Sequence, residues 1–143
     1  MKLIIGLDGH GSGERALQFG QNLASATGSC ELLVVYVIEW SPFSFQTAEE
    51  NAQRHKRREE EIALATERVV VPAVESLKKA GMNARGLVRH GNVADTLIAI
   101  AGDEKADQII VGRTSEGGIA SRLFGSVTAN LVMHADVPVT VVA

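Results

Sequence analysis

The sequence contains a single cysteine, Cys30, so no disulfide can form within the chain. An apolar run begins two residues later, at Leu32, and we expect a buried, reduced thiol. The chain also lacks any run of about 18 apolar residues, which argues against a membrane span. Its opening apolar segment, residues 3–7, reaches Asp8 too soon for a signal peptide. These absences predict a cytoplasmic protein.

Positive charge is also scarce. The 143 residues carry a net charge of -3, with 22% charged and 45% hydrophobic residues. Nucleic-acid binding would require a basic stripe, which this composition does not provide. The same balance is typical of a globular chain, and the length suits one buried core. We therefore expect one domain spanning residues 1–143.

Short apolar runs rich in β-branched residues alternate along the chain with segments of helical period. The expected strands are residues 3–7, 32–38, 84–88, 108–111 and 137–142. The expected helices are residues 14–26, 48–80, 93–102 and a last one from 126 onward. Parallel strands need such crossover helices, so the order predicts an α/β fold: a doubly wound, five-stranded parallel sheet with helices on both faces.

The longest helical segment contains residues that are expected to bend it and to end it. Pro72 should bend the helix or remove one of its hydrogen bonds, and Gly81 is placed as a C-cap. The mixed-sign run 54–61 is either a charged binding tail or a solvated helix face, and its opposite charges at helical spacing favour the second. Before this helix, Trp40, Phe43 and Phe45 predict either a lid or an apolar surface patch.

Two glycine-rich loops follow expected strands, "DGHGSG" after the first and "GRTSEGG" after the fourth. Open parallel sheets bind ligands at the carboxyl ends of their strands, where the strand order reverses. If these two strands are neighbours, the loops face each other there. Asp8 in the first loop could bind a ribose or a metal's water shell, or it could cap the following helix.

The second loop leads toward Gly125-Ser126, where we expect the last helix to begin. A helix start presents unpaired N–H groups and the positive end of a dipole, which bind phosphate. Arg113 and Arg122 would add positive charge. The sequence has neither the common P-loop pattern nor the nucleophile elbow Gly-x-Ser-x-Gly, and His55, His90 and His134 have no metal-binding spacing; we interpret them as surface or helix-end residues.

Several segments together resemble the universal stress protein family. They are Asp8-Gly9, Tyr36-Val37, Gly91 and the closing stretch "VGRTSEGGIASRLFGSVTANLVMHADVPVTVV". Nucleotide-binding members of that family have the pattern Gly-x2-Gly-x9-Gly-[Ser/Thr]. This chain has Gly112, then Ser115 after two residues, then Gly125-Ser126 after nine more. Three of the four marked positions match.

The resemblance implies a flavodoxin-like, Rossmann-like sheet of strand order 3-2-1-4-5, a homodimer, and ATP bound across the switch point. Carried over by position, Asp8 would meet the ribose or adenine side and Val37 would contact adenine through its backbone. The remaining site residues would surround the ribose and phosphates: Gly112, Arg113, Ser115, Gly125, Ser126 and Val127. The family context also implies a role in the stress response and an unidentified protein partner.

Ser115 leaves two hypotheses for this site, one with ATP bound and one without nucleotide. If a left-handed backbone is required there, serine costs about 1–2 kcal/mol relative to glycine and weakens binding roughly tenfold. Members without the glycine pattern are taken not to bind ATP, so a nucleotide-free interaction protein is the alternative. Gly117 and Gly118 keep the loop adaptable and favour retained binding.

Catalysis has little support in the sequence. No serine has an identifiable base partner, and His10 is either a phosphate contact or a solvated loop histidine. Slow ATP hydrolysis, aided by Asp8 or bound Mg²⁺, is the most that these residues suggest. The apolar segment from Pro138 to Val142 is expected to be an edge strand, and exposed edges favour pairing, so we place the homodimer interface there.

Overall fold

The computed structural model describes residues 1–9, 11–39, 48–113 and 118–143. Its centre is a five-stranded sheet of order β3-β2-β1-β4-β5, in which every neighbouring pair is parallel. The predicted doubly wound topology is therefore confirmed. The strands are Lys2–Leu7 (β1), Glu31–Glu39 (β2), Asn83–Gly91 (β3), Gln108–Gly112 (β4) and Val139–Val142 (β5).

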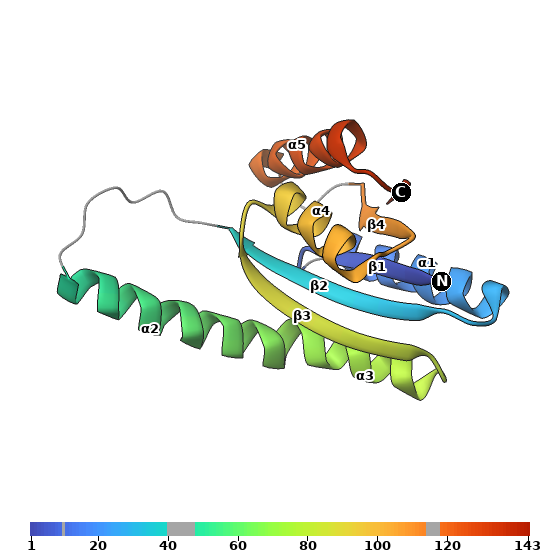
Figure 1. Cartoon of the computed structure of the whole chain (residues 1–143), viewed down its shortest axis with the longest axis horizontal. Coiled ribbons are helices and arrows are strands. Elements are labelled where there is room, and N and C mark those ends of the chain that lie inside the picture. Colours follow the sequence, from blue (N-terminus) through green and yellow to red (C-terminus); the bar gives the residue numbers. More distant parts are fainter. Residues whose placement is uncertain (10, 40–47, 114–117) are drawn as a thin grey trace.

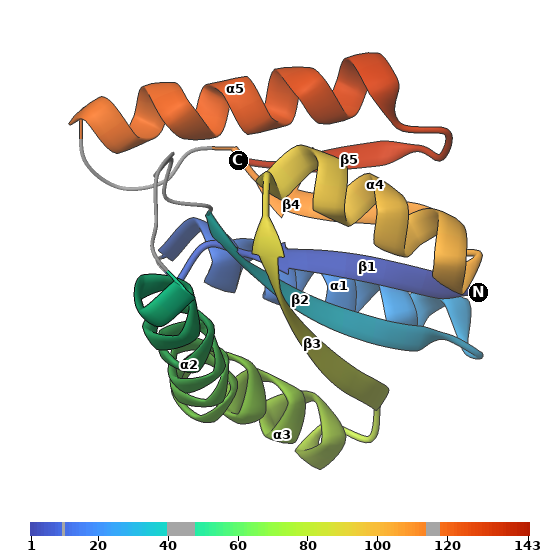
Figure 2. The same ribbon diagram turned by 60° about the vertical axis from the view of Figure 1, so that its left-hand side comes forward.

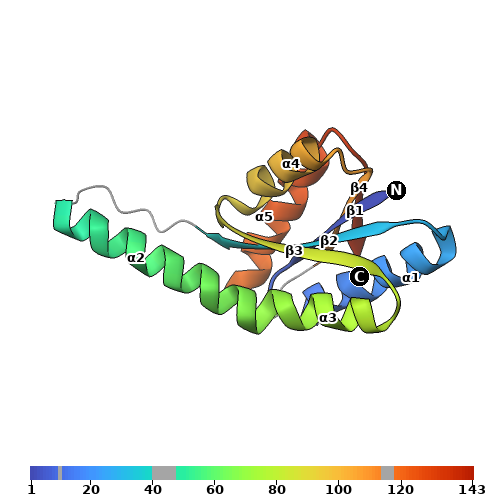
Figure 3. The same ribbon diagram turned by 60° about the horizontal axis from the view of Figure 1, so that its bottom comes forward.

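Helices cover both faces of the sheet (Figure 2 and Figure 3). They are α1 (Gly11–Thr27), α2 (Ala48–Ala65), α3 (Val71–Lys79), α4 (Val93–Glu104) and α5 (Gly118–His134), with a π-helical segment η1 (Thr66–Val70) between α2 and α3. One core lies between the sheet and α4 and α5, and the other between the sheet and α1 and α3. No helix in the described part of the chain is long and apolar enough to cross a membrane.

Strand β2 contributes side chains to both cores. Leu33, Val35 and Val37 pack in the core below α4 and α5, while Leu32 and Val34 pack in the opposite core. This is the two-residue alternation of a strand, with apolar residues on both sides because both faces are covered. The continuous apolar run in the sequence reflects this double burial.

The predicted long helix is divided immediately before its proline. The π-helical segment ends at Val70, and Val71 donates its N–H to the carbonyl of Thr66, five residues earlier. Pro72 then stands in the first turn of α3, where it has no N–H to donate to the preceding π-helical turn. Val70 packs closely over β3, because a Cβ on Gly86 would lie 2.1 Å from its Cγ1. The irregular turn thus fits α3 onto the sheet.

Gly81 ends α3 as predicted. Its φ of +84° is the left-handed conformation, which suits glycine. The N–H of Gly81 bonds the carbonyl of Lys78 at 3.0 Å, and that of Met82 bonds the carbonyl of Leu77 at 3.0 Å. These two bonds form a Schellman motif, which stops the helix and turns the chain into β3.

The amino-terminal part of α2 extends past the carboxyl ends of β2 and β3 (Figure 1). Residues 54–61 in it are exposed or half-buried, so the solvated-face interpretation of the charged run holds. His55 contacts Glu59 at 3.1 Å, one turn along the helix. The aromatic residues Trp40, Phe43 and Phe45 lie outside the described residues.

Two strand boundaries differ from the sequence prediction by more than one residue. β5 begins at Val139 rather than at residue 137, because Pro138 has no N–H to donate; its carbonyl still accepts from Ile109 at 3.0 Å. β3 continues to Gly91, three residues beyond Val88. Its polar end is an edge strand held by pairing with β2, which an apolar pattern does not reveal.

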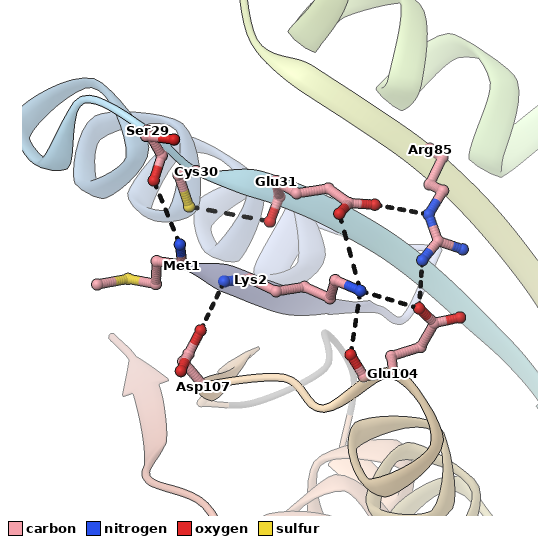
Figure 4. Close-up of polar contacts among 8 residues, drawn as sticks. All are labelled: Met1, Lys2, Ser29, Cys30, Glu31, Arg85, Glu104 and Asp107. Carbon is pink, nitrogen blue, oxygen red and sulfur yellow. Dashed lines mark hydrogen bonds and ion pairs between the residues drawn. The ribbon is translucent and has the colours of Figure 1, made fainter.

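Charged side chains join four elements at the amino ends of the strands (Figure 4). Arg85 of β3 donates from Nε to Glu31 at 2.7 Å and from Nη2 to Glu104 at the end of α4. Lys2 of β1 lies 3.2 Å from Glu104 and 3.8 Å from Glu31. The main-chain N–H of Lys2 also donates to Asp107 at 2.7 Å. This charged cluster of Lys2, Glu31, Arg85 and Glu104 ties β1, β2, β3 and α4 together.

The charged cluster should make stability fall in acid. Hydrogen bonds from Arg85 lower the pKa of the Glu31 and Glu104 carboxyls below their ordinary value of about 4.5. The unfolded chain therefore binds protons at a higher pH than the folded chain does. This stabilisation is fully present above about pH 4.5 and is lost as the pH falls further through the folded pKa values.

Urea unfolding measured between pH 7 and pH 3 tests this expectation. An Arg85→Met variant keeps much of the side-chain volume but removes the guanidinium, so its stability should depend less on pH across this range. Equal pH dependence in the two proteins would mean that other carboxyl groups dominate acid unfolding.

Cys30 corrects the expectation of a buried thiol. It is half-buried at the start of β2, and its Sγ lies 3.8 Å from the carbonyl of Glu31 (Figure 4). Partial burial still raises the pKa of this thiol. The residue lies just before β2 and packs at the margin of the core between the sheet and α1 and α3, which leaves it partly accessible.

Candidate functional site

The loop after β1 is organised by the carboxylate of Asp8. Ser12, which is fully buried, donates its hydroxyl to Oδ2, and the N–H of Gly13 donates to Oδ1 at 3.0 Å. Both donors belong to the first turn of α1, whose positive dipole end favours a carboxylate. A Cβ on Gly13 would lie 2.7 Å from Oδ1, so glycine is needed here for the contact. Of the two interpretations of Asp8, helix capping is the one observed.

The described ends of the two glycine-rich loops meet at Gly112 and Ser12, because β1 and β4 are neighbours. Gly112 ends β4 against the first turn of α1: a Cβ there would lie 2.4 Å from the carbonyl oxygen of Ser12. The glycine is therefore required by contact between two backbones. This contact brings the carboxyl ends of β1 and β4 together at the point where the strand order reverses.

The last helix begins earlier than predicted. α5 starts at Gly118, so Gly125 and Ser126 lie about two turns inside it rather than at its first residue. Ile119 and Leu123 continue the four-residue spacing of Val127 and Leu131 toward the amino terminus, which extends the helical pattern. A single internal glycine costs about 1 kcal/mol relative to alanine and does not stop a helix.

Ser126 and Val127 instead line a cavity of about 260 Å³ at the carboxyl edge of the sheet. Its other walls are the end of β2, the turn from β3 into α4, and the next turn of α5. The described lining residues are Glu39, Gly91, Asn92, Val93, Ala94, Ser126, Val127 and Asn130. The cavity combines the hydroxyl, amide and carboxylate groups of its polar residues with apolar side chains such as Val93 and Val127, which suits a ligand with both polar and apolar parts.

Two further cavities lie elsewhere, and none of their described lining residues belongs to the predicted site. One, of about 310 Å³, lies on the opposite face between α1 and α3. The other, of about 690 Å³, opens at the amino edge beside Cys30. The cavity between α4 and α5, by contrast, is lined by two of the predicted site residues, Ser126 and Val127.

The remaining predicted residues are placed differently. Val37 is only 8% exposed and its side chain belongs to the core, so a contact with a ligand would have to come from its main chain. Arg113 is exposed just after β4, and its N–H donates to the carbonyl of Val142 at 2.7 Å. Ser115 and His10 lie outside the described residues.

One histidine differs from its interpretation as a surface residue. The side chain of His90 is 9% exposed at the end of β3, where Nε2 lies 3.0 Å from Glu61 of α2. The contact links α2 to the sheet. Among the described residues no three His, Cys, Asp or Glu side chains are grouped closely enough to hold a metal ion.

Three polar side chains of the cavity were not predicted from the sequence: Glu39, Asn92 and Asn130. Asn92 precedes α4 and its Oδ1 accepts from the N–H of Asp95 at 3.0 Å, a standard N-cap that could have been recognised before the apolar spacing of that helix. Glu39 continues the alternation of Val35 and Val37, which also was visible in sequence.

Comparison with known proteins identifies relatives along the whole chain. The sequence model of the universal stress protein family matches residues 1–143. A universal stress protein of Methanocaldococcus jannaschii is 28% identical over 99% of this chain and 81% of its own length. One from Mycobacterium tuberculosis is 25% identical over 98% of this chain, which spans only 47% of that relative.

Solved structures share the fold. A universal stress protein from Lactobacillus plantarum superposes with a TM-score of 0.81 at 20% identity, covering 100% of this chain and 97% of its own. A universal stress protein in complex with cAMP gives 0.64 at 24% identity, covering 100% and 96%. An Arabidopsis thaliana member with AMP bound gives 0.65 at 16% identity, covering 99% and 90%.

Proposed function

The chain belongs to the universal stress protein family, and on that premise we propose that it binds an adenine nucleotide at the carboxyl edge of its sheet. The observation that carries the proposal is the cavity of about 260 Å³ lined by Ser126 and Val127. It lies at the edge where open parallel sheets bind ligands. The relatives solved with AMP and with cAMP support the same ligand class.

The described residues fit such a ligand. The Ser126 hydroxyl can donate to a phosphate or a ribose. We place the base against the main chain of Val37, as the family resemblance implies, because the Val37 side chain lies in the core. Arg113 is exposed beside the same edge and can pair with phosphate oxygens. Asp8 and Gly112 join the two loops through Ser12 and support the site from the β1–β4 side. Gly125 and Ser115 complete the proposed set from the sequence pattern.

ATP is the specific nucleotide we propose, with Mg²⁺ carried on its phosphates. Mg²⁺ commonly binds through substrate phosphates, waters and one or two carboxylates, so it needs no dedicated cluster of acids. We propose a regulatory module of the cytoplasmic stress response, formed by one domain over residues 1–143, with at most slow ATP hydrolysis and an unidentified protein partner.

We also propose that the module is a homodimer joined through residues Pro138 to Val142. β5 is an edge strand in the sheet order, and an exposed edge offers unpaired N–H and carbonyl groups to a second copy. The neighbouring helix α5 exposes Val132 and Met133, whose side chains are 62% and 73% accessible. Apolar exposure beside an open edge is typical of an association surface.

A nucleotide-free interaction protein is the second candidate. The position of Gly125 and Ser126 inside α5 favours it, because only the first turn of a helix presents unpaired N–H groups. Native mass spectrometry of gently purified protein, with ATP, AMP or GTP added, separates the two candidates. We expect a dimer that carries adenine nucleotide; a bare protein that ignores all three supports the second candidate.

Ser115→Gly should tighten ATP binding about tenfold, the equivalent of roughly 1.4 kcal/mol, if the loop needs a left-handed backbone there. Isothermal titration calorimetry measures the change. Ser29→Gly, in the exposed turn at the opposite edge of the sheet, is the matched control and should leave affinity unchanged. Equal affinity of the Ser115→Gly variant and the native protein would show that serine already suits this position.

A further inference from the structure

The cavity between α4 and α5 carries a carboxylate on the side away from the predicted phosphate residues. We infer that Glu39, assisted by Asn92 and Asn130, recognises the nucleoside part of the bound nucleotide. Its carboxylate accepts hydrogen bonds from donor groups of the ligand, either ribose hydroxyls or an exocyclic amine of the base. This inference rests on the proposed function and names the residue that sets its specificity.

The direction of the Glu39 side chain follows from the strand. Leu33, Val35 and Val37 of β2 all face α4 and α5, so the residue two positions further on faces the same side. Glu39 accordingly lines the cavity. Its neighbour across the β2–β3 pair is Gly91, which has no side chain to fill the space beside it. The register thus creates a pocket next to the carboxylate.

The other polar groups come from the two helices. Asn92 is fixed by the bond from Asp95 to its Oδ1, so its amide nitrogen is the part that can donate to a ligand. Ser126 and Asn130 are four residues apart on α5 and share one helix face. The cavity therefore presents a donor at the α4 wall, a hydroxyl and an amide at the α5 wall, and an acceptor at the sheet.

The carboxylate of Asp8, the other acid near this edge, caps the start of α1. Both of its oxygens accept hydrogen bonds from the first turn of α1. Glu39 stands at the carboxyl end of the second strand, the position from which an acidic residue binds ribose hydroxyls in dinucleotide-binding sheets of the doubly wound type. The family resemblance implies that Asp8 meets the ribose or adenine side, and Glu39 adds a second acid at the same edge.

Charge also fixes the direction of the ligand. A phosphate beside Glu39 would be repelled, whereas Arg113 follows β4, which is separated from β2 by β1. The phosphates are therefore oriented toward β4 and α5, and the nucleoside lies over the ends of β2 and β3. The same arrangement excludes ligands that carry a phosphate on the ribose 2′-hydroxyl.

The test compares ATP, 2′-deoxyATP and inosine triphosphate, which lacks the exocyclic amine, by calorimetry. Native protein should bind ATP about tenfold more tightly than at least one of the other two, as expected for a lost hydrogen bond to a charged group. Glu39→Ala should lose that preference and bind ATP about tenfold more weakly. Preference lost for 2′-deoxyATP identifies the ribose, and preference lost for inosine triphosphate identifies the base.

Glu75→Ala is the control, since it removes another exposed acid, on α3, and it should bind like native protein. Asn130→Ala should weaken all three ligands while leaving the far-UV circular dichroism unchanged. If native protein binds no nucleotide, the proposed function fails and this inference with it. If native protein binds ATP and Glu39→Ala binds all three ligands as native protein does, the proposed function stands and the role of Glu39 is overturned.

Discussion

Gly112→Val is expected to destabilise the folded protein by about 3 kcal/mol, at the upper end of the usual cost of overpacking. The added Cβ would lie 2.4 Å from the carbonyl oxygen of Ser12 and 2.7 Å from its carbonyl carbon and Cβ. These are atoms of a buried helix start, held by the bonds from Ser12 and Gly13 to Asp8. They cannot rotate away, so β4 and α1 must separate.

The same substitution should weaken nucleotide binding, because the two loops would no longer meet. Urea unfolding followed by circular dichroism measures the stability, and calorimetry with ATP measures the site. Gly102→Ala is the control: nothing lies within 4 Å of a Cβ there, and the residue is inside α4. Alanine should stabilise the protein at that position by about 0.5–1 kcal/mol. Similar effects at the two glycines would mean that the Ser12 contact is unimportant.

Burial on both faces made the fold predictable from sequence. Runs such as Leu32 to Val35 are apolar at every position because α4 packs on one side and α3 on the other. The intervening helices have a different period, so the order of elements and hence the parallel sheet could be deduced. Gly81 likewise carries its own signal, since a left-handed residue after a helix has few alternatives to glycine.

The sequence was less informative where structure depends on neighbours. The polar end of β3 is a strand only because β2 pairs with it through Gly91, and no apolar pattern marks an edge. Gly125 suggested a helix start, but the apolar spacing from Ile119 onward outweighs one glycine. At the end of β3, pairing with β2 outweighed the polar sequence. At Gly125, the apolar spacing of the whole helix outweighed the single glycine.

The candidate site likewise contains some residues that could be predicted from the sequence and others that could not. Ser126 and Val127 were predicted and do line a cavity, because their place after the fourth strand follows from topology. Asp8 was equally well placed, yet Gly13 and Ser12 engage its carboxylate, and the choice between ribose contact and cap depends on their geometry. Glu39 was missed because an acidic residue at the end of a strand does not by itself indicate a binding site. The cavity beside it becomes visible only when the pairing of Glu39 with Gly91 is known.

Leu97→Ala is expected to lower the free energy of unfolding by about 3 kcal/mol, within the range measured for fully buried leucines. The side chain is 1% exposed and lies where α4 meets the centre of the sheet. It packs on Gly6 of β1: a Cβ there would lie 3.2 Å from Leu97 Cδ1 and 3.1 Å from Val111 Cγ1. Leu64→Ala, on a side chain 48% exposed in α2, should change stability by less than about 0.5 kcal/mol.

Gly6 provides a test of the packing itself. In native protein Gly6→Ala should be nearly neutral or slightly destabilising, because the ends of Leu97 and Val111 must each move by a few tenths of an ångström. In the Leu97→Ala protein the same methyl enters the space that leucine vacated and should recover about 1 kcal/mol, close to the value of one buried methylene. Residues in contact should couple in this way, whereas strictly additive effects would place α4 at a different height over β1.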